Sequence, residues 1–150
     1  MNVTWVLGFP TGAEKGQYLT MDLGGTNLRV CWITLQGRKA ETTVKQLSYK
    51  LPENMKTGSA ENLWKYVTES LSDFISSEKL KGLADKPLPL AFTFSYPATQ
   101  DCIDHGVLQR WTKGFDIDGV EGEDVAAQLR KAIEQKVEQP RSSHAQCLRY

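Results

Sequence analysis

The chain has 150 residues, which is enough for one domain with a sizeable hydrophobic core. Hydrophobic residues make up 40% and charged residues 24%, a composition typical of globular proteins rather than disordered chains. Lys and Arg together number 18, as do Asp and Glu, so the chain has no net positive charge with which to bind nucleic acid. No apolar run is long enough to span a bilayer, and residues 1–10 lack the basic region of a secretory signal.

The cysteines give the same picture of the cellular environment. Cys31, Cys102 and Cys147 are far apart, and no Cys-x-x-Cys or Cys/His cluster accompanies them. This spacing indicates neither a disulfide framework nor a zinc site. We therefore expect reduced thiols in a cytoplasmic protein.

Three strand-forming segments come first in the chain. Residues 17–23, 28–35 and 42–51 have the composition of β-strands, and turn-forming residues separate them at 24–27 and 36–39. Consecutive strands joined by tight turns predict a three-stranded antiparallel meander.

A long amphipathic helix is predicted next, over residues 60–80. Its apolar positions recur at helical spacing along one stripe, with Trp64 beside it. The stripe consists of Leu63, Val67, Leu71, Phe74 and Ile75. Ser59 precedes the helix and is a suitable N-cap.

The second half begins with an apolar run at residues 88–97, bounded by prolines, which favours a buried, central strand. A loop is expected over 98–106, then a short strand within 107–115. A final helix is predicted over 121–136, with Val125, Leu129 and Ile133 on one face. The polar residues 137–150 lack periodicity and predict a disordered tail.

The turn after the first strand, Asp22-Leu23-Gly24-Gly25-Thr26-Asn27, carries the first candidate chemistry. Glycines permit positive φ and leave room for a phosphate, and consecutive amides can form an anion-binding nest. Thr26 and Asn27 add donors, Asp22 could orient a hydrated Mg²⁺, and Arg29 could contact a phosphate. An ordinary Gly-Gly hairpin explains the glycine pair equally well, and the sequence is not a Walker P-loop.

A second candidate set consists of Ser95, Thr112 and Lys113. Ser95 directly follows the apolar strand, and Thr112 and Lys113 precede Gly114. Hydroxyls and an ammonium group supply the donors and acceptors that a polyol such as a sugar needs. The alternative is that these are ordinary turn and surface residues.

Two polar clusters are interpreted as surface. His105 lies beside Asp101 and Asp104, where a metal or catalytic role competes with the commoner surface histidine. Five carboxylates before the final helix fit its N-terminus and solubility better than a metal cage. They are Asp116, Asp118, Glu121, Glu123 and Asp124.

Three stretches together resemble one family. "GFPTGAEKGQYLTMDLGGTNLRV" (8–30), "LAFTFSYPATQ" (90–100) and "GVLQRWTKGFDI" (106–117) are similar, in this order, to the N-terminal half of eukaryotic hexokinases, most of all the fungal ones. The resemblance implies an α/β fold, the small domain of the actin-like ATPase or ribonuclease H-like class, starting with a three-stranded antiparallel meander. It implies an incomplete small domain over residues 1–136 and an unrelated tail over 137–150.

The resemblance also implies roles for particular residues. The hexose-contacting residues would be Ser95, Thr112 and Lys113, with ATP and Mg²⁺ as cofactors and Asp22 reaching Mg²⁺ through water rather than as a direct ligand. The ATP phosphates would be bound by Asp22, Leu23, Gly24, Gly25, Thr26, Asn27 and Arg29.

The implied reaction is ATP-dependent phosphorylation of glucose or a related hexose at the 6-hydroxyl. The family's aspartate base has no counterpart among these residues, so no catalytic residue is assigned and the isolated chain is expected to be inactive. The alternatives are a non-catalytic hexokinase-like protein that binds sugar or regulates a partner, another actin-like ATPase module, and a remnant that does not fold stably.

Overall fold

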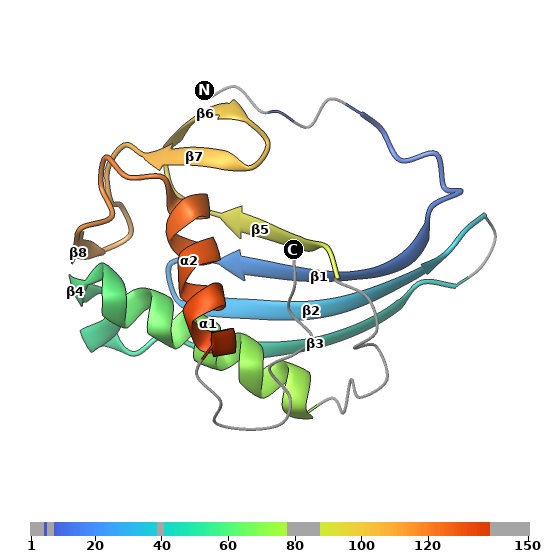
Figure 1. Cartoon of the computed structure of the whole chain (residues 1–150), viewed down its shortest axis with the longest axis horizontal. Helices are drawn as coiled ribbons and strands as arrows, with labels where there is room; N and C mark the ends of the chain where they lie inside the picture. The colour runs from blue at the N-terminus through green and yellow to red at the C-terminus, as the bar shows by residue number, and fades with distance from the viewer. Residues whose placement is uncertain (1–4, 6–7, 39–40, 78–87, 139–150) are drawn as a thin grey trace.

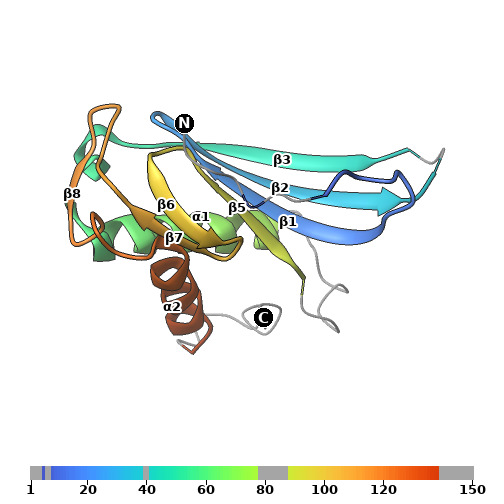
Figure 2. The same cartoon turned by 90° about the horizontal axis from the view of Figure 1, so that it is seen from above.

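The computed structural model describes Trp5 and residues 8–38, 41–77 and 88–138. A twisted sheet forms one layer, and both helices lie on the same side of it (Figures 1 and 2). The strands of this sheet stand in the order β3-β2-β1-β5.

The predicted meander is confirmed. Strand β1 (Lys15–Leu23) pairs antiparallel with β2 (Asn27–Gln36), which pairs antiparallel with β3 (Thr43–Lys50). Gly37 takes a φ of 90° in the second turn, a conformation that other residues rarely adopt.

Strand β5 (Leu90–Phe94) runs parallel to β1 and lies at the edge of the sheet within the described residues. The prediction of a buried, central strand is therefore wrong. The side chains of Ala91 and Thr93 are exposed, whereas Phe92 and Phe94 are half-buried on the covered face. The residues are uniformly strand-forming, but they alternate between the two faces as in any strand with one covered side.

Helix α1 (Ala60–Ser77) packs across the covered face of the sheet. The predicted apolar stripe is buried, and Phe74 and Val67 are fully inaccessible to solvent, whereas Ile75 is half-buried. Ser59 caps the helix as expected, since its hydroxyl oxygen accepts from the Asn62 amide at 3.4 Å. Residues 78–80 of the predicted helix lie outside the described residues.

The connection from β3 to α1 contains a short 3-10 helix, η1 (Glu53–Met55), and strand β4 (Thr57–Ser59). Strand β4 pairs in parallel with β8 (Asp116–Asp118). Asp116 and Asp118, which the sequence analysis grouped at the N-terminus of the final helix, thus lie in a strand instead.

The loop expected over 98–106 is a hairpin, so that prediction is wrong. Strands β6 (Ala98–Cys102) and β7 (His105–Leu108) pair antiparallel through a turn at Ile103 and Asp104. The register shifts between Thr99 and Cys102. No glycine marks this turn, and the irregular register breaks the alternation by which a hairpin is recognised.

Helix α2 (Val125–Glu138) begins four residues later than predicted and buries Val125, Leu129 and Ile133 as expected. It begins there because the Asp124 carboxylate accepts from the Ala126 amide at 3.0 Å, as an N-cap does. The helix includes residues 137 and 138 of the predicted tail, and residues 139–150 lie outside the described part of the chain.

Candidate functional site

The two candidate sets meet at one end of the sheet. Strands β1 and β5 are parallel, so their carboxyl ends lie together, at the left in Figure 1. The glycine turn follows β1, and Ser95 follows β5. The Ser95 amide donates to the Leu23 carbonyl at 3.2 Å, which continues the pairing of the strands past β5.

Asp22 connects the residues of this end. Its carboxylate accepts from the Ser95 hydroxyl at 3.3 Å, and its other oxygen lies 3.5 Å from the Arg29 guanidinium. Asp22 and Arg29 are opposite each other in the β1–β2 register, on the face that α1 does not cover. The two side chains keep 37% and 54% of their surface exposed, so the pair remains open to a ligand.

The glycine turn is closed by one hydrogen bond, from the Gly24 amide to the Asn27 carbonyl at 3.0 Å. The amides of Gly25 and Thr26 have no acceptor among the described residues, which leaves two donors for an anion. Glycine permits a positive φ, but neither Gly24 nor Gly25 adopts one. Gly25 is small for another reason: a Cβ there would lie 3.0 Å from Cδ of Lys113.

Lys113 reaches the turn from the loop 109–115. Its φ is 60°, and Gly114 after it has a φ of 79°, so the chain reverses sharply here. The ammonium donates to the Ser95 carbonyl oxygen at 2.5 Å. The structure therefore brings Lys113, Ser95, Asp22 and Gly25 together.

Thr112 is placed differently. It is half-buried, and its backbone carbonyl accepts from the Phe115 amide at 3.2 Å, which closes the reversal. Its hydroxyl has no hydrogen-bond partner among the described residues. The structure thus leaves this side chain available without linking it to the Asp22 network.

An aromatic cluster supports the Lys113 loop; it consists of Phe94, Tyr96, Trp111 and Phe115. Trp111 stacks on Phe115 with centroids 5.3 Å apart, and Tyr96 meets each of these two rings edge-on. The indole of Trp111 also donates to the Ile117 carbonyl at 3.0 Å. The Trp111 amide donates to the Glu121 carboxylate, so one of the acidic residues fixes this loop.

Tyr96 is a site residue that the sequence analysis missed. It is 7% exposed, and its hydroxyl donates to the Gly24 carbonyl at 3.0 Å. The Lys113 ammonium lies 4.9 Å from the centre of its ring. Burial raises the pKa of the Tyr96 hydroxyl well above its ordinary value, so this group stays a donor even at a pH where an exposed tyrosine ionises. The one sequence signal was its position next to Ser95, at the end of an apolar strand.

His105 belongs to a separate surface cluster. Its Nδ1 lies 2.6 Å from the Asp101 carboxylate, and its Nε2 lies 4.0 Å from that of Asp124. In the described part of the chain, no three His, Cys, Asp or Glu side chains gather closely enough to hold a metal ion. Cys31 and Cys102 are free thiols, and Cys147 lies outside the described residues.

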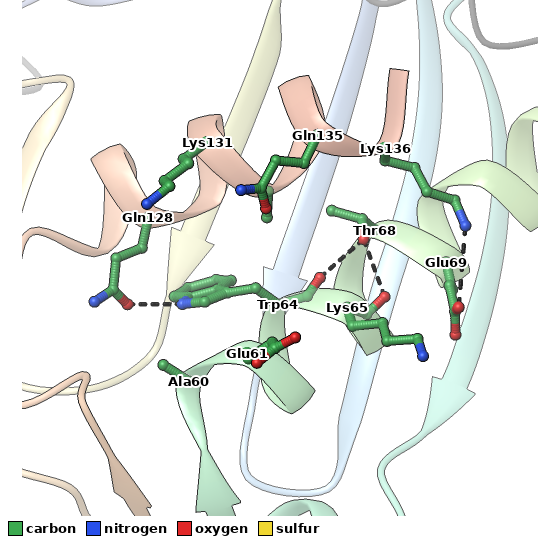
Figure 3. A pocket seen from close by; sticks show the side chains of 11 residues that line it. Ala60, Glu61, Trp64, Lys65, Thr68, Glu69, Gln128, Lys131, Gln135 and Lys136 are labelled. Atoms are coloured by element: carbon green, nitrogen blue, oxygen red, sulfur yellow. Dashed lines mark hydrogen bonds and ion pairs between the residues drawn. The ribbon is translucent and has the colours of Figure 1, made fainter. Parts of the chain in front are cut away.

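A groove of about 560 Å³ lies between the two helices (Figure 3). At the left in Figure 3 the Trp64 indole donates to the Gln128 side chain at 2.7 Å, and at the right Lys136 lies 4.0 Å from Glu69. None of the predicted site residues lines it. The groove is therefore distinct from the site at the end of β1 and β5.

The fold and this site define an α/β domain of the actin-like class, in which a glycine turn meets polar side chains at the end of a sheet. Residues 1–145 match the family model described as hexokinase. The chain belongs to the hexokinase family. The helices of the described residues include none with the length and apolarity needed to cross a membrane.

Individual relatives agree with this assignment. The chain is 58% identical over 136 residues to the hexokinase of Emericella nidulans and 51% identical over 133 residues to hexokinase-1 of Saccharomyces cerevisiae. These matches cover 91% and 88% of this chain but 28% and 27% of the relatives. A solved structure of Schistosoma mansoni hexokinase complexed with glucose matches with a TM-score of 0.83 and 40% identity, over 91% of this chain and 30% of that one. The chain therefore spans about a quarter of the length of its relatives.

Proposed function

We propose that this chain supplies the phosphate-binding turn and part of the hexose site of a hexokinase, which transfers the γ-phosphoryl group of ATP to the 6-hydroxyl of glucose or a related hexose. The observation that carries the proposal is the Asp22 network. It joins the turn to Ser95 and Lys113, which are distant in sequence, in a chain of the hexokinase family.

The turn suits a polyphosphate. The Gly25 and Thr26 amides point to no acceptor among the described residues, and a Cβ on Gly24 would meet only the Asn27 carbonyl, at 3.6 Å. A phosphate can thus approach the backbone closely. Mg²⁺, when bound with ATP, would neutralise charge that develops on the phosphates, and the acceptor-only carboxylate of Asp22 can hold its water ligands.

The hexose would bind beside the turn. The Ser95 hydroxyl, which donates to Asp22, can also accept, and the Lys113 ammonium keeps two donors beyond the one that bonds the Ser95 carbonyl. The free hydroxyl of Thr112 lies in the same loop as Lys113. The relative from Schistosoma mansoni was solved with glucose, which favours glucose as the first hexose to test.

We assign no general base to this chain. A positioned base contributes roughly 10²–10⁴-fold to a rate, so we expect the 150-residue chain to show no glucose-dependent ATP turnover. Clear turnover that disappears in Asp22→Asn would contradict this expectation. Glucose binding without turnover would also fit the alternative of a non-catalytic sugar-binding protein.

Binding is tested by following the backbone amides of the isotope-labelled chain by NMR during titration with glucose. We expect shifts at Ser95, Thr112 and Lys113, with a dissociation constant above about 1 mM, the affinity of a weak site worth roughly 4 kcal/mol. Lys113→Met should weaken binding, whereas Lys131→Met, which removes an exposed lysine from α2, should not. Sub-millimolar binding, or equal effects of the two variants, would overturn the proposed half-site.

A parallel titration with magnesium tripolyphosphate tests the turn. We expect the Gly25 and Thr26 amides to shift most, because these two donors have no acceptor among the described residues. Shifts confined to surface lysines would mean that the turn does not bind phosphate.

A further inference from the structure

We propose that Tyr96 is a positioning residue that couples the glycine turn to Lys113, so that a ligand on one side of the site alters the other side. The coupling of two ligands rests on the proposed function. The link between the glycine turn and Lys113 in the ligand-free chain rests only on the contacts of Tyr96.

Tyr96 contacts both halves of the site with different parts of one side chain. Its hydroxyl donates to the Gly24 carbonyl at 3.0 Å, and its ring faces the Lys113 ammonium at 4.9 Å. An ammonium over an aromatic face is attracted by the negative charge of that face. A displacement of either group is therefore felt by the same ring.

The ring itself has little freedom. Its centroid lies 4.8 Å from that of Phe94, 4.9 Å from Trp111 and 5.2 Å from Phe115, so three aromatic rings pack against it. Close packing of this kind transmits a displacement rather than absorbing it. The buried hydroxyl would lose its partner if the turn moved away, and an unpaired buried donor is unfavourable.

Lys113 contacts both the glycine turn and the residue before Tyr96. Its ammonium donates to the carbonyl of Ser95, the residue before Tyr96, and its aliphatic chain covers Gly25, where a Cβ would lie 3.1 Å from Cβ of Lys113. The turn, Tyr96 and Lys113 therefore touch one another pairwise. A rearrangement of one member requires the other two to move.

The first experiment uses the ligand-free chain and compares Tyr96→Phe with Tyr66→Phe. Tyr66 is a matched control, because its hydroxyl also donates to a backbone carbonyl, that of Lys50, at 2.9 Å. The Phe variant at 96 keeps the ring and removes only the bond to Gly24. We follow amide exchange at Gly24 and the ring-current shift of the Lys113 ε-methylene protons by NMR.

In Tyr96→Phe we expect exchange at the Gly24 amide to accelerate roughly 5- to 10-fold. The turn that this amide closes through Asn27 loses the hydrogen bond that Tyr96 donates to the Gly24 carbonyl. We also expect the Lys113 ε-methylene resonance to move, although the substitution keeps the ring that faces Lys113. Tyr66→Phe should change neither signal. The proposal is overturned if Lys113 is unaffected by Tyr96→Phe, or if both variants act alike.

Lys113→Met supplies the reverse arm and replaces Tyr96→Phe if that variant does not fold. Loss of the ammonium should shift the Tyr96 ring resonances and the Gly24 amide, whereas Lys131→Met should not. Unchanged Tyr96 and Gly24 signals in Lys113→Met would show that the two ends are not linked.

The ligand arm separates this inference from the proposed function. Glucose added to the wild-type chain should shift the Gly25 and Thr26 amides as well as those of the Lys113 loop, and Tyr96→Phe should remove the shifts in the turn only. If glucose shifts no resonance, the proposed hexose site fails, while the ligand-free arms still decide whether Tyr96 links the turn to Lys113. If glucose shifts the turn equally in both chains, the coupling through Tyr96 is wrong.

Discussion

The glycine turn and the Lys113 loop lie side by side, but they are held in place by different means. The turn joins two strands that are paired along their whole length, so the register of β1 with β2 determines where Gly24 and Gly25 lie. The loop has no such ladder and depends on Trp111 and Phe115 packing against Tyr96. One half of the site is therefore defined by local strand pairing, and the other by packing against Tyr96, which follows β5.

The largest effect is expected where the loop depends on packing. Phe115 is 6% exposed and stacked on Trp111, so Phe115→Ala should lower the free energy of unfolding by about 3–5 kcal/mol, the usual cost of removing a buried aromatic ring. Urea denaturation measures the change. Ile103→Ala, at a residue that is 64% exposed, is the control and should change stability little. A loss below about 1 kcal/mol for Phe115→Ala would mean that the aromatic cluster does not hold the loop.

A smaller effect is expected at the two helix N-caps, because one of them also bonds a strand and the other bonds only its own helix. Asp124 caps α2 and also accepts from the Gly106 amide at 3.0 Å, whereas Ser59 caps α1 with one bond of 3.4 Å. Asp124→Ala should cost about 2–3 kcal/mol, because it removes a cap and leaves a buried amide without a partner. Ser59→Ala should cost about 0.5 kcal/mol. Equal losses in urea denaturation would show that the contact between β7 and α2 adds nothing.

The two glycines of the turn allow a sharper comparison. A Cβ on Gly25 would press on Lys113, whereas a Cβ on Gly24 meets only an ordinary contact at 3.6 Å, and neither residue needs a positive φ. Gly25→Ala should therefore cost about 1–2 kcal/mol by overpacking, and Gly24→Ala should cost less than about 0.5 kcal/mol. Urea denaturation of both variants measures the difference. A larger loss for Gly24→Ala would show that the turn has a different geometry.

The smallest effect concerns pH. Burial raises the pKa of Tyr96, so its contribution to stability is complete below the ordinary tyrosine pKa of about 10 and is lost as pH rises toward the higher folded value. The reason is that the unfolded chain ionises first. Tyr96→Phe removes this proton, so its stability should fall less steeply above pH about 10 than that of the wild type. Parallel slopes in thermal unfolding between pH 8 and 11 would contradict the burial of this hydroxyl.

The local half of the molecule was predictable from sequence, for physical reasons. The meander and α1 follow from alternation and from the spacing of Val67, Leu71 and Phe74, patterns that one element displays by itself. The turn at Gly24 and Gly25 lies where the strands end. Family resemblance then pointed to Ser95 and Lys113. Ser95 lies beside the turn because β1 and β5 pair in parallel.

The remainder depends on contacts that no single segment displays. The β6–β7 hairpin turns at Ile103 and Asp104 without a glycine, so the sequence lacks the Asn-Gly or Asp-Gly signal of a tight hairpin there. Tyr96 joins the site only because the fold brings the Gly24 carbonyl within hydrogen-bond distance of its hydroxyl. Glycine permits a positive φ, but neither glycine of the turn adopts one, and a Cβ on Gly25 would press on Lys113. The sequence alone does not show whether a glycine is required for its backbone conformation or because a neighbouring side chain leaves no space for a Cβ.

The bond from Tyr96 to Gly24 spans 72 positions of the chain, which has a consequence for the order of folding. The meander closes short loops and can form early, whereas contacts between distant segments wait for the entropy of a long loop closure to be overcome. We expect the hydrogen bonds of β1 and β2 to be protected before the site closes in pulse-labelling hydrogen exchange. Simultaneous protection of the Gly24 turn and the Lys113 loop with the meander would contradict this order. A chain that has formed only the meander of β1, β2 and β3 would thus still lack the candidate site, which forms when β5 pairs with β1.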